Sequence, residues 1–289
     1  LANANIIWND SANSNYREQF ISILNAANQT GQLFGKPRES GKIGGISTEV
    51  YTLSSNQLDL PIFKFQSAVG GVTRQFEIIP STITDSDSIY ESSPVPGTGL
   101  TYTYRSDGSG DSSNNTGFFF LFKQGRLESQ DFTVDNSVTN FVKSFATSNI
   151  NDTDVYLYKL DQFGQIAEAW SKVPSLSGNN AIYNSLSKTE RNVYNVVTKA
   201  NDAIDLVFGD GNFANIPLGN FRLYYRISDN AKYGIQSSDM QNVQLTVPYT
   251  DANGAQQTLS LSLSLKSSVY NAAATESNDA IKEKASQVY

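Results

Sequence analysis

Cysteine and histidine are both absent from this chain of 289 residues. Without cysteine there is no disulfide and no thiolate nucleophile. Without histidine the commonest general base and metal ligand is missing, so Ser-His-Asp and Cys-His chemistry cannot arise within the chain. Zinc held by His or Cys is excluded for the same reason. The chemistry left open is that of carboxylates, lysine or tyrosine.

Charge is also scarce. Charged residues make up 17% of the chain and its net charge is −7, whereas about 25% charged residues is usual. The acidic balance argues against nucleic acid as a partner, because phosphate binding needs Lys and Arg gathered on one face. No apolar run approaches the ~20 residues that a transmembrane helix needs. Asn, Ser and Thr take the place of charge, which favours a chain that lies against other protein.

The first 45 residues are expected to hold one helix and an arm. In SNYREQFISILNAANQTG (residues 14–31) the apolar residues fall on one helical face. Asn15 with Glu18 resembles a capping box, and Gly31 is a suitable stop. The segment LFGKPRESGKIGG (residues 33–45) contains Gly and Pro and is interpreted as a connecting arm. The chain starts at Leu1 instead of Met, so we expect a fragment of a longer protein.

Residues 46–180 are expected to form a β-rich domain. Short alternating or apolar runs separated by polar turn clusters are typical of strands, and they read ISTEVYTLS, PIFKFQ, VTRQFEIIP and LTYTYR. A mobile loop is predicted near 105–117, where the sequence is RSDGSGDSSNNTG. The all-apolar run Phe118–Phe122 fits a strand covered on both faces. DVYLYKLDQFGQIAEAWSKV predicts a hairpin that turns near Gln162–Gly164.

Residues 181–289 are expected to form a second β domain with a short C-terminal helix. In QTLSLSLSLK the leucines alternate with serines, which predicts a strand with one apolar face. TESNDAIKEKA (residues 275–285) carries acid early and lysine late, which suits a helix dipole. The fold class predicted is therefore mainly β with a few helices, an α+β arrangement of antiparallel β modules with a helix near each end.

One glycine- and proline-containing stretch of this last domain could be a binding or catalytic loop, but we interpret it as a structural arch. In IDLVFGDGNFANIPLGNFRLYYRI two alternating strands flank a loop. Glycine supplies the positive φ angles of a tight turn, and proline presets the corner of a second one. The residues assigned to the arch are Gly209, Asp210, Gly211, Pro217 and Gly219. Phe213 and Ile216 are expected to plug it.

Three functional readings of the arch are weaker. A phosphate bound by this loop would be repelled by the carboxylate of Asp210. A calcium-binding loop needs about six or seven oxygen ligands, and this stretch does not reach that number. A catalytic Asp210 lacks a partner carboxylate nearby in sequence. Three further acidic pairs could act as general acid and base, but their turn contexts favour capping: Asp85 with Asp87, Asp152 with Asp154, and Asp202 with Asp205. We therefore predict no catalytic, cofactor-binding or metal-binding residue.

A resemblance extends this interpretation. The run FGDGNFANIPLGNFRLYYR is similar to an F-G-[DN]-G-x-x-[GA]-x-[IV]-P-x-G pattern followed by an aromatic strand. Further pieces agree in order along the chain: SNYREQF, LFGKPRESG, TGFFFLFKQGRL, DVYLYKLD, YNSLSKTERNVY and SVYNAAATESNDAIKEKA. Together they resemble the baseplate wedge subunit of T-even-like contractile-tailed phages, within the baseplate J-like family. Ser286 stands where that family usually has proline after the last helix.

The resemblance implies an architectural role and no catalytic residues. Similar subunits self-associate, join neighbouring wedges into a ring around the tail hub, and rearrange when the sheath contracts. The expected partners are the chain itself and other baseplate wedge proteins, with no nucleic acid, membrane or small-molecule substrate. The expected location is the virion tail baseplate, after assembly in the host cytoplasm.

Two other functions stay open at this point. One is a receptor- or glycan-binding module of a phage tail fibre, which would present an exposed aromatic platform beside Asp or Asn side chains. The other is a tail-associated glycoside hydrolase with two carboxylates, which would require an environment that raises the pKa of one of them.

Overall fold

The computed structural model describes most of the chain and divides it into two compact units. The described residues are 2–7, 39–43, 45–53, 63–84, 88–91, 100–105, 115–176, 191–212, 214–229, 233–250, 256–265 and 268–269. Unit 1 takes those up to Gln124 and those from Tyr233 to Val269, and unit 2 takes Gly125 to Asp229. The units therefore differ from the three consecutive segments that we expected, because unit 1 is built from both ends of the described chain.

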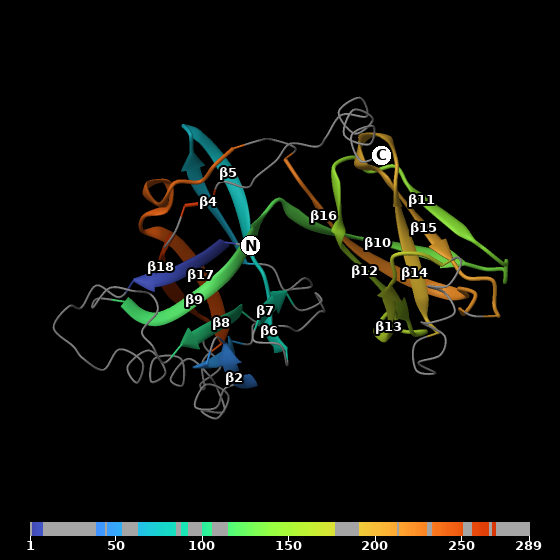
Figure 1. Ribbon diagram of the computed structural model, residues 1–289, viewed down its shortest axis with the longest axis horizontal. Coiled ribbons are helices and arrows are strands. Elements are labelled where there is room, and N and C mark those ends of the chain that lie inside the picture. The colour runs from blue at the N-terminus through green and yellow to red at the C-terminus, as the bar shows by residue number, and fades with distance from the viewer. Residues whose placement is uncertain are drawn as a thin grey trace. The chain divides into compact units, whose positions relative to one another are not determined.

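Unit 1 consists of strands, one short 3-10 helix and no longer helix among its described residues (Figure 1). Its elements are β1 (Ala2–Ile7), β2 (Glu39–Ile43), β3 (Ile46–Leu53), β4 (Phe63–Val69), β5 (Val72–Ile78), β6 (Ser81–Thr84), β7 (Ser88–Glu91), β8 (Leu100–Arg105), β9 (Asn115–Gln124), η2 (Ser237–Met240), β17 (Val243–Thr250) and β18 (Gln256–Leu265). One sheet has the order β17-β18-β1-β9-β8-β3-β2, with β5 pairing β9 and β4 pairing β5, while β6 and β7 form a separate ribbon.

This sheet joins the first and the last described strands, because β1 lies between β18 and β9. The alternation predicted for β18 is seen at the end of the strand where side chains are described, since Leu263 and Leu265 are buried and the intervening Ser264 is not. Strand β17 pairs with β18 in antiparallel register from Val243 to Thr250. The buried rings of Phe65, Phe76 and Phe122 pack with centroids 5.4 to 5.6 Å apart. Aromatic pairs of this kind stabilise beyond the area they bury.

Unit 2 is a single seven-stranded sheet with the order β10-β16-β12-β13-β14-β15-β11 (Figure 1). Its elements are β10 (Arg126–Val134), β11 (Val142–Phe145), β12 (Ile150–Leu160), β13 (Ile166–Lys172), β14 (Val193–Thr198), η1 (Ala200–Asp202), β15 (Ile204–Phe208) and β16 (Gly219–Ile227). All pairings are antiparallel except that of β13 with β14. The hairpin predicted around Gln162–Gly164 is confirmed as β12 and β13.

The sheet of unit 2 curls around one apolar core. Strands β10 and β11 are opposite edges of the sheet, yet the rings of Phe132 and Phe145 lie edge to face with centroids 5.6 Å apart. The inward side chains form one buried cluster: Phe132, Val134, Phe145, Ile150, Val155, Leu157, Trp170, Tyr194, Ile204, Leu206, Phe208, Phe221, Leu223 and Tyr225. The Tyr194 hydroxyl donates to the carbonyl of Val155 (2.8 Å), so this polar group is satisfied within the core.

The predicted α+β class is wrong. The described part is mainly β and contains no helix of seven residues or more, only the 3-10 helices η1 and η2. Residues 39–43, expected in an arm, form β2 and pair with β3 in a hairpin that Ile43 and Ile46 close. The pairing satisfies backbone N–H and C=O groups that an unpaired arm would leave open. The segments 14–31 and 275–285, where the two helices were predicted, lie outside the described residues.

The loop predicted near 105–117 is shorter at both ends. Arg105 belongs to β8, and Asn115 already belongs to β9. The residues between them lie outside the described ranges. Within β9 the side chains of the apolar run that the structure describes are buried, with Phe120, Leu121 and Phe122 all less than 5% exposed. A strand inside a sheet and covered on both faces has this pattern.

Candidate functional site

The arch connects β15 to β16, two strands that pair with other strands and not with each other. At its first corner the carboxylate of Asp210 accepts the backbone N–H of Asn212 (2.9 Å) and the side-chain amide of Asn212 (3.2 Å). The N–H of Gly211 donates to the carbonyl of Ala214 (2.9 Å). Gly211 has a φ of +89°, which a residue with a Cβ atom adopts only with strain. Asp210 therefore caps its own turn.

The two sides of the arch approach closely at Gly209. A Cβ atom built on Gly209 would lie 2.3 Å from the Cβ of Ala214, so no larger residue fits there without movement. The second corner contains Pro217, which is buried, and Gly219, which has a φ of +102° and begins β16. Ile216, expected to plug the arch, is half-buried, and its Cδ1 lies 3.1 Å from the position of a Cβ on Gly211. Phe213 lies outside the described residues.

An arginine that sequence reasoning missed holds the tip of the arch. One nitrogen of the Arg191 guanidinium, Nη2, donates to the carbonyls of Gly211 and Asn212, both at 3.0 Å. The backbone carbonyl of Arg191 accepts the N–H of Asn215 (2.8 Å), and the N–H of Asn140 donates to the carbonyl of Gly209 (3.0 Å). These bonds join segments far apart in the chain. No local sequence pattern indicates them.

Asparagine amides extend this network along β14. Asn215 donates through Nδ2 to Oδ1 of Asn192 (2.7 Å), and Asn192 donates to the carboxylate of Glu168 on β13. Asn195 donates to the carbonyls of Val173 (2.9 Å) and Pro174 (2.8 Å). Amide side chains have both donors and acceptors, so they can satisfy backbone groups that the sheet leaves open. The network fixes the arch to the sheet.

In the two acidic pairs that the structure describes, one member of each is held by a basic residue. Asp154 is buried against Arg226, with Oδ2 3.3 Å from Nε, whereas Asp152 is exposed. Asp205 pairs with Lys199 at 2.7 Å, and the bond from Lys199 lowers the pKa of the Asp205 carboxyl. Asp202 lies in η1 with a φ of +53°. Residues 85 and 87 lie outside the described ranges.

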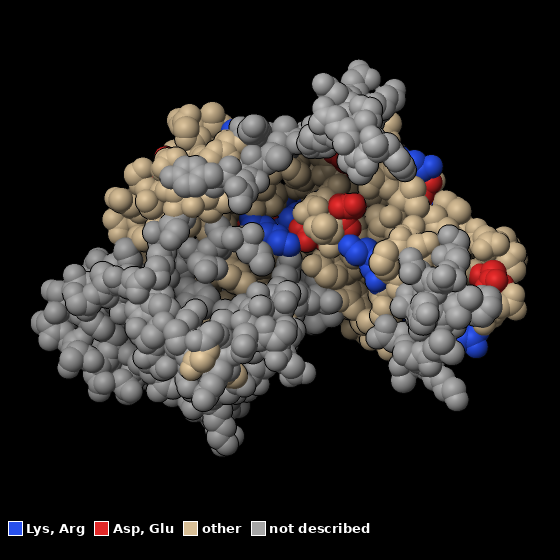
Figure 2. Space-filling view, in the orientation of Figure 1, with Lys and Arg blue, Asp and Glu red and all other residues tan. Residues whose placement is uncertain are grey.

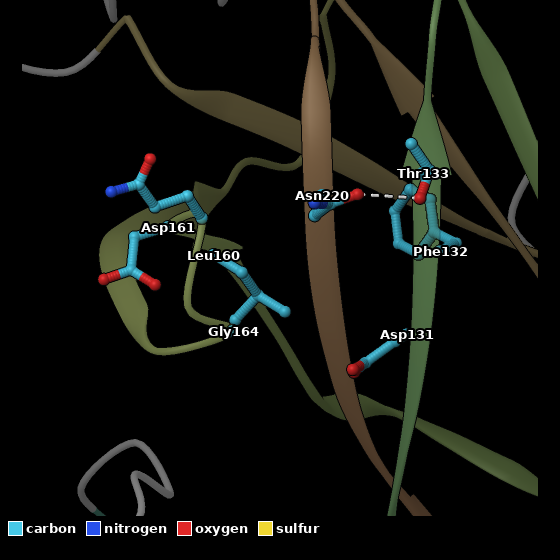
Figure 3. Close-up of a pocket in the computed structure, with 8 residues that line it drawn as sticks. Asp131, Phe132, Thr133, Leu160, Asp161, Gly164 and Asn220 are labelled. Carbon is cyan, nitrogen blue, oxygen red and sulfur yellow. Dashed lines mark hydrogen bonds between the residues drawn. The ribbon is translucent and has the colours of Figure 1, made fainter.

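A small pocket lies at the far end of β12, away from the acidic pairs. It has a volume of about 290 Å³ and is lined by Asp131, Phe132, Thr133, Leu160, Asp161, Gln162, Gly164 and Asn220. Figure 3 shows the turn with Asp161 and Gly164 on one side of this space, and Asn220 on β16 and Asp131 on β10 on the other, while the carboxylate of Asp161 points away from these two strands. Both carboxylate oxygens of Asp131 accept hydrogen bonds from Arg222, at 2.7 and 2.8 Å. Asp131 also holds the pKa of Arg222 above its ordinary value, because the ion pair favours the charged guanidinium.

Neither a metal cluster nor a membrane span is found in the described ranges. No three His, Cys, Asp or Glu side chains there lie together as metal ligands would. None of the helices described is long and apolar enough to cross a bilayer. On the face shown in Figure 2, uncharged side chains cover most of the described surface, and charged ones occur in small groups of both signs.

The fold is that of a β-sheet protein of two units. Its arch has glycine and proline at the corners and is held by hydrogen bonds from an arginine and several asparagines. The chain belongs to the family DUF8360, described as a domain of unknown function, whose model matches residues 1–268. No curated protein and no solved structure matches the chain.

Proposed function

We propose that the chain is a structural subunit of the baseplate wedge of a contractile phage tail, one that associates with itself and with other wedge proteins and catalyses no reaction. The resemblance of the arch sequence to that of wedge subunits is the origin of the proposal. Its location is then the virion tail baseplate, where the ring of wedges rearranges when the sheath contracts.

The observation that supports the proposal is that the polar groups of the arch form hydrogen bonds within the protein. Asp210, the residue that a binding or catalytic loop would present, instead caps the turn through Asn212. The two carbonyls at the tip are bonded by Arg191. A loop whose polar groups are hydrogen-bonded within the protein keeps a fixed conformation. These groups are then not available to bind a ligand. Such a corner suits a part that transmits force between neighbouring subunits.

The low charge of the chain gives a second, weaker support. Interfaces that stay assembled are depleted in charge at their centres and enriched in aromatic residues, and this chain has 17% charged and 11% aromatic residues. Permanent assemblies of this kind often bury more than ~2,000 Å² at each interface. A hydrolase is less well supported, because Asp154 and Asp205 are each already paired with a basic residue.

Sedimentation velocity on the full-length protein at micromolar concentration tests the proposal. We expect species larger than a monomer, with a fraction that grows with concentration by mass action. The same protein mixed with the other wedge proteins of its phage should form complexes of fixed stoichiometry. A chain that stays monomeric alone and in the mixture would exclude the structural role.

A further inference from the structure

We infer that the outer edge of β10 pairs with β10 of a second copy of this chain, so that two sheets of unit 2 join into one. Strand β10 stands at one end of the order β10-β16-β12-β13-β14-β15-β11, and among the described strands only β16 pairs with it. An edge strand presents a row of backbone N–H and C=O groups to which another strand can bind. The inference deepens the self-association proposed above and rests on that part of the proposal.

Strand β10 lacks the devices that usually prevent pairing between edges, which are shortness, lysine, proline and bulges. The other described edges of the two large sheets each have one. β11 has four residues, β2 has five including Lys42, β17 contains Pro248, and β4 contains Lys64. β10 has nine residues with neither proline nor lysine, and it pairs with β16 in continuous register from Arg126 to Val134. An unprotected edge of this length favours another strand as its partner.

The middle of β10 is accessible from both faces of the sheet. Ser129, Gln130 and Asp131 are consecutive, so their side chains alternate between the two faces, and all three are exposed. Leu223, which lies opposite Gln130 on β16, is fully buried. Burial therefore begins one strand further into the sheet, and the middle of the edge is open to an approaching strand.

The partner is a second copy because the sequence of β10 is complementary to itself. Antiparallel pairing about a twofold axis at Gln130 matches all nine residues of the strand. The two Gln130 side chains then face each other, and each amide offers a donor and an acceptor to the other. An axis at Glu128 or Asp131 would instead place like charges directly opposite each other, which is destabilising. With the axis at Gln130, each charged residue faces an uncharged one of the other copy: Arg126 faces Val134, Glu128 faces Phe132, and Asp131 faces Ser129.

The charges on β10 are also paired within the subunit. Both carboxylate oxygens of Asp131 accept hydrogen bonds from Arg222, at 2.7 and 2.8 Å. Arg126 contacts Glu128, with Nη2 2.5 Å from Oε1. In the register centred on Gln130 the two copies of Asp131 are diagonal neighbours, and the Arg222 guanidinium groups reduce their repulsion. The charges of the strand therefore do not oppose the pairing.

Disulfide crosslinking of the full-length protein tests this edge, because the chain has no cysteine and a single-cysteine variant can form a disulfide only between two chains. Gln130→Cys places the two thiols opposite each other, where the Cα atoms of antiparallel strands are ~4.5–5.5 Å apart, within the range of a disulfide. We expect a reductant-sensitive dimer on a denaturing gel after mild oxidation. Thr133→Cys is the matched control, since Thr133 is exposed on the same strand but its copy would lie about 20 Å away along the strands. It should crosslink at least tenfold more slowly.

Gln130→Lys tests the same edge without a crosslink. Two ammonium groups would face each other at the axis, so the dissociation constant of the dimer in sedimentation velocity should rise at least tenfold. The side chain of Gln130 is exposed, so the fold should persist, and a thermal melt checks this. Gln165→Lys makes the same exchange at another exposed glutamine of unit 2 and should leave the dissociation constant unchanged.

The inference is overturned if the Gln130 and Thr133 cysteines crosslink at equal rates, or if Gln130→Lys associates as the wild type does. The proposed structural role would survive either result, because the wild type would still associate through another surface. A wild type that is monomeric alone, but loses a complex with another wedge protein through Gln130→Lys, would assign the edge to that protein and exclude the second copy. A wild type that is monomeric alone and in the mixture would contradict both the inference and the proposed role.

Discussion

Arg226 on β16 and Asp154 on β12 form an ion pair in the interior of unit 2. The Nε atom of Arg226 lies 3.3 Å from Oδ2 of Asp154, and the side chains are only 4% and 2% exposed. Asn151 donates to the same Oδ2 atom (3.0 Å). A buried ion pair adds little net stability compared with a pair of apolar residues in the same place. Removal of one partner is costly, however, because the other charge is left buried and unpaired.

Asp154→Ala should therefore lower the free energy of unfolding by about 3–5 kcal/mol. Chemical denaturation followed by tryptophan fluorescence measures this, because Trp170 lies in the core of unit 2. The matched control is Glu128→Ala, which removes the acid of the exposed pair Arg126–Glu128 and should cost less than about 1 kcal/mol. Equal effects of the two substitutions would show that burial does not govern this pair.

Substitutions at Gly211 test the backbone of the arch. With φ at +89°, Gly211→Val should cost about 1–3 kcal/mol and disrupt the arch locally, because β-branched residues resist positive φ. Gly211→Asn is the matched control, since asparagine tolerates this region far better. Thermal denaturation should place Asn between Gly and Val. An unchanged melting temperature for the Val variant would contradict the arch geometry.

Arg191→Ala tests the clamp on the arch tip. The substitution removes two hydrogen bonds to the carbonyls of Gly211 and Asn212, which should destabilise the protein by about 1 kcal/mol because the guanidinium is exposed. The sharper readout is hydrogen exchange at the Gly211 amide, which is bonded to Ala214 and should exchange at least several times faster in the variant. Arg126→Ala, on the exposed pair with Glu128, should leave that exchange rate as it is. An unchanged exchange rate of the Gly211 amide in the Arg191 variant would show that Arg191 does not hold the tip of the arch.

The pair Lys199–Asp205 predicts a pH dependence of stability. Lys199 lowers the pKa of Asp205 in the folded state, so the pair stabilises the protein above the unfolded carboxyl pKa of about 4. That stabilisation is lost as the pH falls through the lower folded pKa. The melting temperature of Lys199→Met should thus lie below that of the wild type at pH 6 and approach it below pH 4.

Asp205→Asn is the control for this prediction, because it removes the titrating group and should abolish the pH-dependent difference. A gap between the wild type and Lys199→Met that stays constant down to pH 2 would exclude Asp205 as its source. So would a gap that widens as acid is added.

Several elements could be predicted from local sequence. The Gly-Asp-Gly and Pro-x-Gly spacings placed the corners between Ile204–Phe208 and the strand that contains Phe221, because these residues set backbone angles directly. The turn at Gln162–Gly164 and the alternation along β18 depend on the same short-range rules. The abundance of asparagine also has a local reason, since Asn140, Asn149, Asn201 and Asn242 all adopt positive φ in turns.

The rest depends on contacts between distant residues. Nothing near Arg191 indicates that it bonds to Gly211, and nothing in β1 indicates that it lies between β9 and β18. The pairing of β2 with β3 is by contrast a local hairpin, where the Gly and Pro residues of the segment led us to expect an arm. The pocket lined by Asp131, Leu160 and Asn220 combines residues from β10, β12 and β16, so only the folded chain brings its polar groups together.

The proposed structural role is tested by cryo-electron microscopy of tail particles purified from a contractile phage that carries a gene for this chain. We expect several copies of the chain in a symmetric ring of wedges around the tail hub, in contact with each other or with other wedge proteins. Particles that lack the chain, or that carry it as one isolated copy away from the baseplate, would contradict the proposed role.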